Sequence, residues 1–249
     1  MLKCRYKTMG LARLIRHVDC FMKTFPKSMC IFVLLLGAQC RADLILWTGP
    51  TDTTDVTNIS TNGTLESAFN GGNSTVTANG VTFASSSVLG NTFAGVLGGG
   101  TSGDADFDTL LDEFTFGSGT GDVVLDIGNF VLGDTYEVQV FYTDQRPGGT
   151  SDRVMRFDDD GTGTNSFVDL ESNPDNTIGS PFGQFAIGTF TSDGTDLNLI
   201  LNAQGFGNAH ITAWQIRNIT SVPEPSSTIL MFVLVFSGVR NRRRRASLC

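Results

Sequence analysis

The segment from Asp43 to Val222 contains no cysteine and no lysine, and its single histidine is His210. Without cysteine it can form no disulfide and offers no thiol nucleophile or thiolate ligand. One histidine excludes metal sites built from several histidines. A Ser–His–Asp triad would have to use His210, and the sequence has no Gly-x-Ser-x-Gly elbow to present the serine. We therefore expect His210 to be an ordinary histidine at the start of a strand.

Positive charge is also scarce in this segment. The whole chain has 25 acidic and 17 basic residues, but Asp19 and Glu224 are the only acidic residues outside the segment and 13 of the basic residues lie outside it. The segment thus has 23 acidic residues against four arginines, a net charge near −19. Such a surface repels nucleic acid and anionic lipid, so neither is expected as a partner.

Turn-forming residues alternate with short apolar runs, which predicts an all-β domain. Asn79-Gly80 supplies the two positive φ values of a tight hairpin between 74–78 and 81–83. Segments 121–127 and 135–142 are expected to pair as a second hairpin. Further strands are predicted at 182–190, 196–201 and 210–219, and one helix at 106–114, with Asp106 or Asp108 as its cap. The pattern favours a single β-sandwich over residues 43–221.

The N-terminal 42 residues have the order of a secretory signal peptide. Met29–Ala38 is a short apolar core behind a basic flank, and Cys40-Arg-Ala42 places small residues where signal peptidase cleaves. Residues 1–21 precede a better-proportioned start at Met22. We expect the exported chain to begin near Asp43.

The C-terminal segment, residues 222–249, combines three signals in order. Pro223, Glu224 and Pro225 are followed by an apolar run of 12 residues, Thr228–Val239, and then by Arg242, Arg243, Arg244 and Arg245. Prolines end the folded domain, the apolar run favours lipid, and the arginines stay on the cytoplasmic side. The run is shorter than the ~20 residues of a relaxed membrane-spanning helix. An ordinary C-terminal anchor is the alternative to a sorting signal.

This tail resembles the PEP-CTERM sorting signal of bacteria that export proteins into an extracellular polysaccharide matrix. The resemblance implies a short hydrophobic sorting helix, transient anchoring in the inner membrane and recognition by exosortase, a membrane cysteine protease. It implies delivery to the cell surface or the extracellular matrix, with the tail either cleaved or kept as an anchor.

Two stretches of the domain carry a second, looser resemblance. Gly133–Arg146 contains Tyr136, Val138, Val140 and Tyr142 at period two, and Ala213–Arg217 closes the domain. They are similar to strands of galactose-binding-like jelly rolls, including malectin-like modules. The resemblance implies a jelly-roll sandwich whose last strand pairs back near the N-terminus, in a superfamily that often binds sugars.

Candidate sugar-binding residues gather where three of the four arginines fall within eleven positions. Aromatic rings stack on sugar rings, and charged groups bind hydroxyls. The candidates are Tyr142, Asp144, Arg146, Arg153 and Arg156. The alternative is that these arginines simply pair with Asp144, Asp152 and Asp158.

A candidate calcium loop runs from position 158 to 169. Oxygen-bearing side chains at its relative positions 1, 3, 5 and 12, with Gly163 at position 6, follow the spacing of an EF-hand loop. The predicted ligands are Asp158, Asp160, Thr162 and Asp169. Thr162 and Asp169 depart from the usual residue types, and flanking helices are not predicted. An acidic, glycine-rich hairpin turn is the alternative.

These observations lead to three hypotheses for the function. The first is a non-enzymatic exported protein that is sorted by exosortase and binds extracellular polysaccharide. The second is a structural or adhesive surface protein without a specific ligand. The third is a secreted polysaccharide hydrolase, because paired carboxylates among 23 acidic residues are easily found.

Overall fold

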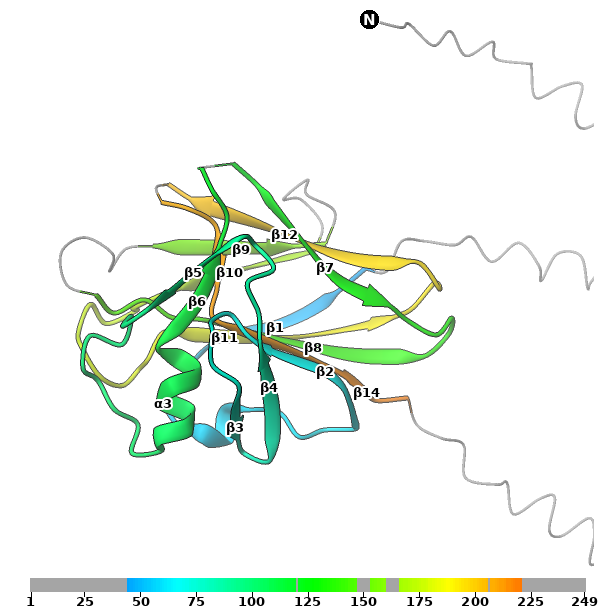
Figure 1. The fold of residues 1–249 in the computed structure, drawn as a ribbon. Coiled ribbons are helices and arrows are strands. Elements are labelled where there is room, and N and C mark those ends of the chain that lie inside the picture. Colours follow the sequence, from blue (N-terminus) through cyan, green and yellow to red (C-terminus); the bar gives the residue numbers. More distant parts are fainter. Residues whose placement is uncertain (1–43, 120, 147–152, 160–165, 206, 221–249) are drawn as a thin grey trace, which may run out of the picture. The chain divides into compact units, whose positions relative to one another are not determined.

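The computed structural model describes residues 44–119, 121–146, 153–159, 166–205 and 207–220. These residues form a mostly β domain (Figure 1). In chain order its elements are β1 (Leu46–Asp52), the 3-10 turn η1 (Val56–Asn58), β2 (Thr64–Asn70), β3 (Val76–Ala78), β4 (Val81–Ser85), β5 (Asn91–Ala94), α3 (Ala105–Leu111), β6 (Glu113–Phe116), β7 (Val123–Asn129), β8 (Thr135–Tyr142), β9 (Val154–Asp158), β10 (Phe167–Glu171), β11 (Gln184–Thr191), β12 (Asp196–Gln204), β13 (His210–Ile211) and β14 (Ala213–Asn218).

The strands form three sheets. The largest has the order β1-β11-β8-β14-β2-β4-β3, the second has β10-β9-β12-β7, and the third has β13-β6-β5. Pairing is antiparallel except between β2 and β4. The first two sheets face each other with the main apolar core between them, so the predicted all-β sandwich is confirmed.

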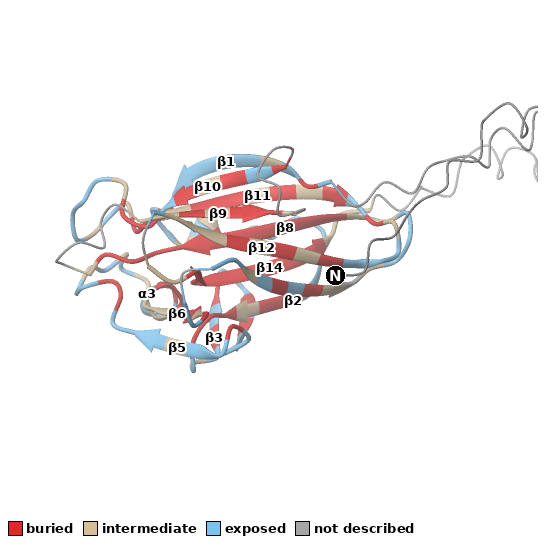
Figure 2. Cartoon of the chain, turned by 90° about the horizontal axis from the view of Figure 1, so that it is seen from above, coloured by how far each residue is buried: buried red, intermediate tan, exposed pale blue. Residues whose placement is uncertain are grey.

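Strand β8 lies inside the large sheet, between β11 and β14, and its side chains point to both faces of the sheet. Its alternate residues Tyr136, Val138, Val140 and Tyr142 all point into the main core, as the period of two predicts. Phe141 points to the opposite face and joins a second apolar cluster with α3. Figure 2 shows this strand and its neighbours as mostly buried, whereas the edge strands β1 and β5 are largely exposed.

Helix α3 covers the second cluster with Phe107, Leu110 and Leu111, which are fully buried. The predicted helix is therefore confirmed over Ala105–Leu111, but its predicted end at Phe114 is wrong, because Glu113–Phe116 forms β6. Its cap is Asp104 and not Asp106 or Asp108. The Asp104 side chain accepts hydrogen bonds from the backbone N–H groups of Asp106 and Phe107 at 3.1 and 2.9 Å, which satisfies two of the donors at the helix start.

The Asn79-Gly80 hairpin is confirmed. Strands β3 and β4 pair across it, and both turn residues have positive φ values of 47° and 74°. The side chain of Asn79 also donates to the carbonyl oxygen of Ile59 at 2.9 Å. The local sequence favours this turn because both positions need backbone angles that Asn and Gly tolerate.

The second predicted hairpin is wrong. Strand β7 pairs with β12 in the four-stranded sheet, whereas β8 pairs with β11 and β14 in the large sheet. The short connection between them crosses from one sheet to the other, with the backbone N–H of Val131 donating to the Tyr136 hydroxyl at 3.1 Å. Both strands have an apolar face at period two, and that pattern does not distinguish a strand's hydrogen-bonded neighbour from the strand it packs against.

Candidate functional site

Three segments far apart in sequence enclose a cavity of about 310 Å³. They are Arg146 and Arg153, which follow β8, the paired strands β5 and β6, and the residues leading into β13. Strand β13 is held against β6 by pairing of His210 with Phe116. We call this space the His210 cavity. Its lining residues are Phe93, Phe114, Phe116, Arg146, Arg153, Gly207, Asn208 and His210.

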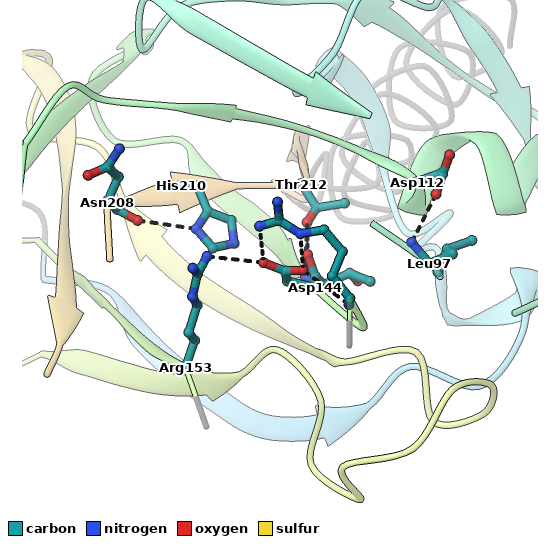
Figure 3. A network of polar contacts seen from close by, with 9 residues as sticks. Leu97, Asp112, Asp144, Arg153, Asn208, His210 and Thr212 are labelled. Atoms are coloured by element: carbon teal, nitrogen blue, oxygen red, sulfur yellow. Dashed lines mark hydrogen bonds and ion pairs between the residues drawn. The ribbon is translucent and has the colours of Figure 1, made fainter. Parts of the chain in front are cut away.

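Asp144 lies beside the cavity, and its side chain is fully buried. Arg146 donates to both of its carboxylate oxygens, with distances of 2.8 Å from Nε and 2.7 Å from Nη2. Arg153 donates from Nη1 to Oδ2 at 3.1 Å (Figure 3). The Asp144 carboxylate raises the pKa of Arg146 through these hydrogen bonds. Both the charge of Arg146 and its position are thereby fixed.

Aromatic rings support the arginine. The Arg146 guanidinium carbon lies 4.4 Å from the centre of the Phe93 ring and 5.5 Å from that of Phe114. Phe93 and Phe114 stack on each other with centroids 5.7 Å apart. Phe93 lies on β5, and 42 % of it is exposed, so the cavity has an apolar aromatic surface that solvent can reach.

His210 lies in the wall of the cavity and is 1 % exposed. Its ring packs between Phe114 and Tyr142, with centroid distances of 4.2 and 4.5 Å. Its Nδ1 lies 3.2 Å from the carbonyl oxygen of Asn208 (Figure 3). Burial lowers the pKa of His210 to about 4, so the ring is neutral at neutral pH. Among the described residues, nothing forms a hydrogen bond with Nε2.

Tyr142 does not have the exposed position that we expected of a residue stacking on a sugar. It is fully buried at the end of β8, behind the His210 ring. Burial raises the pKa of its hydroxyl above the usual range, so the group stays protonated. Within the described part of the chain the hydroxyl has no hydrogen-bond partner. The expectation of an accessible ring at Tyr142 was wrong because an apolar-faced central strand buries its last residue too.

Arg156 is separated from the other two arginines. It lies on β9 and donates to both oxygens of Asp169 on β10, at 2.8 Å each. Its guanidinium also stacks over Phe167, 3.8 Å from the ring centre. Arg156 does not line the His210 cavity. Of the five sugar-binding candidates, the structure brings together Asp144, Arg146 and Arg153, with Tyr142 behind them.

The predicted calcium ligands fall on a β-hairpin. Asp158 ends β9 and is buried, and it pairs with Phe167, while Asp169 on β10 is bonded to Arg156. Asp160 and Thr162 lie outside the described residues. Within the described ranges, no group of three or more potential metal ligands occurs. The Arg156 pairing gives Asp169 a structural role, and calcium binding by this loop stays a prediction.

The signal peptide, the Pro223–Pro225 motif and the Arg242–Arg245 cluster lie outside the described residues. Among the helices that the structure describes, none is both long and apolar enough for a membrane span. Comparison of the chain with family models, curated proteins and solved structures gave no match. The inference of function therefore depends on the sequence motifs and on the geometry of the His210 cavity.

Sequence reasoning missed Phe93, Phe114, Asn208 and His210 as cavity residues. His210 does begin a strand as predicted, but its side chain points into a cavity that β5, β6 and β8 complete. The available signal was composition, because His210 is the one histidine between Asp43 and Val222. Which aromatic residues meet it depends on the pairing of β13 with β6, almost a hundred positions earlier in the chain, and no local pattern encodes that pairing.

Proposed function

We propose that this chain is a non-enzymatic exported protein that exosortase sorts to the cell surface or the extracellular polysaccharide matrix, and that it binds carbohydrate in the His210 cavity. Signal peptidase and exosortase are its partners during processing, and extracellular polysaccharide is its partner afterwards. The ordered tail at 222–245 supports the sorting, and the jelly-roll resemblance of residues 133–146 and 213–217 supports the finer fold.

The observation that carries carbohydrate binding is the exposed Phe93 ring beside the fixed Arg146 guanidinium. Sugars present an apolar face of C–H groups and a rim of hydroxyls. An aromatic ring covers the first, and guanidinium N–H groups donate to the second. The volume of about 310 Å³ lies at the lower end of the range for ligand sites, which suits one or two sugar rings.

The same geometry argues against a hydrolase at this site. Glycoside hydrolysis usually needs two carboxyl groups on either side of the scissile bond. Asp144 is the carboxylate beside the described cavity, and its two oxygens are bonded to Arg146 and Arg153. Both oxygens of this carboxylate accept hydrogen bonds from arginines and so point away from a bound substrate's glycosidic oxygen in this arrangement, and no second carboxylate lines the described cavity.

Phe167 offers a matched control for Phe93. Both rings are about two-fifths exposed, at 38 % and 42 %, and each supports an arginine that is paired with an aspartate. Phe93 lines the cavity and Phe167 does not. Phe93→Ala and Phe167→Ala therefore remove similar surface aromatics, one of them at the proposed site.

The test is binding of the full chain to a panel of bacterial and plant polysaccharides by affinity electrophoresis and titration calorimetry. We expect Phe93→Ala to weaken binding roughly tenfold, as for an aromatic anchor worth more than 1 kcal/mol, and Phe167→Ala to leave it unchanged. Equal effects of the two variants would remove the cavity from the proposal. Failure of the natural protein to bind any glycan would favour the structural or adhesive alternative.

A further inference from the structure

His210 is held in one orientation and one tautomer. Phe114 and Tyr142 clamp its ring from two sides, and the carbonyl oxygen of Asn208 accepts the hydrogen of Nδ1. A carbonyl oxygen has no hydrogen to give, so Nδ1 must carry the proton. In the neutral ring the other nitrogen, Nε2, then has a lone pair and acts as an acceptor.

This acceptor is buried, and among the described residues it has no donor. A buried polar atom without a partner costs roughly 1–3 kcal/mol, so such an atom in a native protein needs an explanation. Because the residue lines the cavity, the missing donor can come from whatever occupies the cavity.

We infer that Nε2 of His210 accepts a hydrogen bond from a hydroxyl group of a sugar ring bound in the His210 cavity, which makes His210 a specificity-determining residue for hydroxyl-bearing ligands. The inference rests on the proposed carbohydrate binding and names the group that the site recognises.

A hydroxyl fits these surroundings better than an anion does. It donates one hydrogen, which Nε2 needs, and it still accepts from a donor such as an arginine N–H group. Carboxylate and sulfate oxygens have no hydrogen to donate, and their lone pairs would face the lone pair of Nε2. The low pKa of His210, about 4, keeps that lone pair available at neutral pH.

Access to Nε2 requires a side chain to move. The atom itself is closed to solvent, whereas the neighbouring side chains of Arg146 and Arg153 are 27 % and 20 % exposed. Gly207, which also lines the cavity, has its α-carbon next to the Arg153 guanidinium, and a Cβ there would lie 3.4 Å from Arg153 Nε. We expect the Arg153 side chain, which also lines the cavity, to move as the sugar enters.

The experiment pairs ligand variants with protein variants. The full-length chain is titrated with the methyl pyranosides of galactose, glucose and mannose, and with each monodeoxy derivative of the tightest of them. One deoxy sugar is expected to bind about tenfold more weakly, or about 1.4 kcal/mol, to the natural protein. His210→Phe keeps a ring in the stack and removes the acceptor, so it should bind the parent and that deoxy sugar equally. His210→Gln, which restores an acceptor, should recover part of the difference.

A second measurement uses the natural protein alone. Nitrogen-15 spectra of the imidazoles should show an unprotonated Nε2 at neutral pH that shifts on addition of the methyl pyranoside and not of sodium sulfate. The chain has one other histidine, His17, so a His17→Gln variant assigns the signal. This measurement decides the question even if His210→Phe fails to fold.

The outcomes separate the two proposals. If no sugar binds and Phe93→Ala changes nothing, the carbohydrate function and the role of His210 both fail. If sugars bind through Phe93 but every deoxy derivative keeps its affinity, or the Nε2 signal stays unchanged, the inference about His210 alone is overturned. In that case a buried water is the donor to Nε2.

Discussion

Two buried polar clusters border the large sheet, and they differ in how fully their atoms are hydrogen bonded. The first, which we call the polar ladder, consists of Glu137, Gln139, Gln215 and Arg217 on β8 and β14. The second is the group around the His210 cavity. Strand pairing places Gln139 opposite Gln215 and Glu137 opposite Arg217, so the ladder is part of the sheet itself.

The polar groups of the ladder form hydrogen bonds with one another and with a neighbouring loop. Gln215 donates to the side-chain oxygen of Gln139 at 2.7 Å, and Arg217 donates to Gln215 at 3.2 Å. The segment from Asn58 to Gly63 provides the remaining partners: Gln139 donates to the carbonyl oxygen of Asn58 at 2.7 Å, and Ser60 donates to Glu137. Among the described residues, no side-chain atom of the ladder is buried without a partner.

The cavity cluster contrasts with the ladder on this point. Both Nε2 of His210 and the hydroxyl of Tyr142 are buried without a partner in the described part of the chain. The ladder therefore holds the loop from Asn58 to Gly63 against the sheet, and its polar atoms need no further hydrogen-bond partner. His210 lines the cavity beside two arginines, and Tyr142 lies behind its ring. The two unpaired atoms cost stability, and the ligand that we propose would pair with Nε2 of His210.

The largest effect is expected from Asp144→Ala. Removing the carboxylate takes away the group to which Arg146 and Arg153 donate. Breaking a buried ion pair in this way costs roughly 3–5 kcal/mol. Urea unfolding measures the loss. Asp196→Ala, which removes an exposed aspartate, should change the free energy of unfolding by less than about 0.5 kcal/mol. Similar small effects of both variants would mean that Asp144 is not the anchor of the cluster.

The next largest effect is a pH dependence of the free energy of unfolding, which comes from His210 in the cavity and not from the ladder. The folded pKa of His210 is about 4, below the usual 6.5, because burial disfavours the charged ring, and the charges of Arg153 and Arg146 act in the same direction against that of Asp144. As the pH falls, His210 therefore binds a proton in the unfolded chain before it does so in the folded protein. The free energy of unfolding should be highest above pH 6.5 and should decrease toward pH 4, by about 3 kcal/mol in total.

Unfolding measured between pH 4 and pH 7 checks this sign. In His210→Phe the part of the slope due to histidine should disappear, while the carboxylates contribute equally to both proteins. A natural protein whose stability falls no more steeply than that of His210→Phe would contradict the low pKa.

A moderate effect is expected in the ladder from Gln215→Leu. The change removes the donor to Gln139 and to the carbonyl oxygen of Ser60, and the acceptor for Arg217. Unpaired buried groups should cost roughly 1–3 kcal/mol. Sugar affinity should stay unchanged, because the ladder does not line the cavity. A loss of sugar affinity at unchanged stability would reverse the roles of the two clusters.

Sequence patterns predicted the features that depend on a few neighbouring residues. The Asn79-Gly80 turn, the core face of β8 and the helix near Asp106 all follow from spacing and residue type within ten positions. The helix cap was placed two to four residues too late, because Asp104, Asp106 and Asp108 are all suitable caps and packing of Phe107, Leu110 and Leu111 selects among them.

The candidate site could be predicted only in part, because it depends on long-range pairing. The cluster of arginines indicated Asp144, Arg146 and Arg153. It also suggested Arg156, which the β9–β10 pairing places beside Asp169 instead. The aromatic side of the cavity, including Phe93 and Phe114, becomes adjacent to His210 only once β13 pairs with β6.

The smallest effect is expected from Tyr142→Phe, and Tyr136→Phe is its matched control. Both tyrosines point into the core from the same face of β8, and both are buried, at 0 % and 2 % exposure. The Tyr136 hydroxyl accepts from the backbone N–H of Val131 at 3.1 Å, whereas that of Tyr142 has no partner among the described residues. Losing the Tyr136 hydroxyl should cost about 1 kcal/mol. Losing the Tyr142 hydroxyl should leave the stability unchanged or raise it by up to about 1 kcal/mol, because an unpaired buried hydroxyl is removed.

Thermal melts of the two variants compare them directly. Equal destabilisation would mean that the Tyr142 hydroxyl is hydrogen bonded in the folded protein, and the contrast between the satisfied ladder and the unsatisfied cavity would then rest on His210 alone.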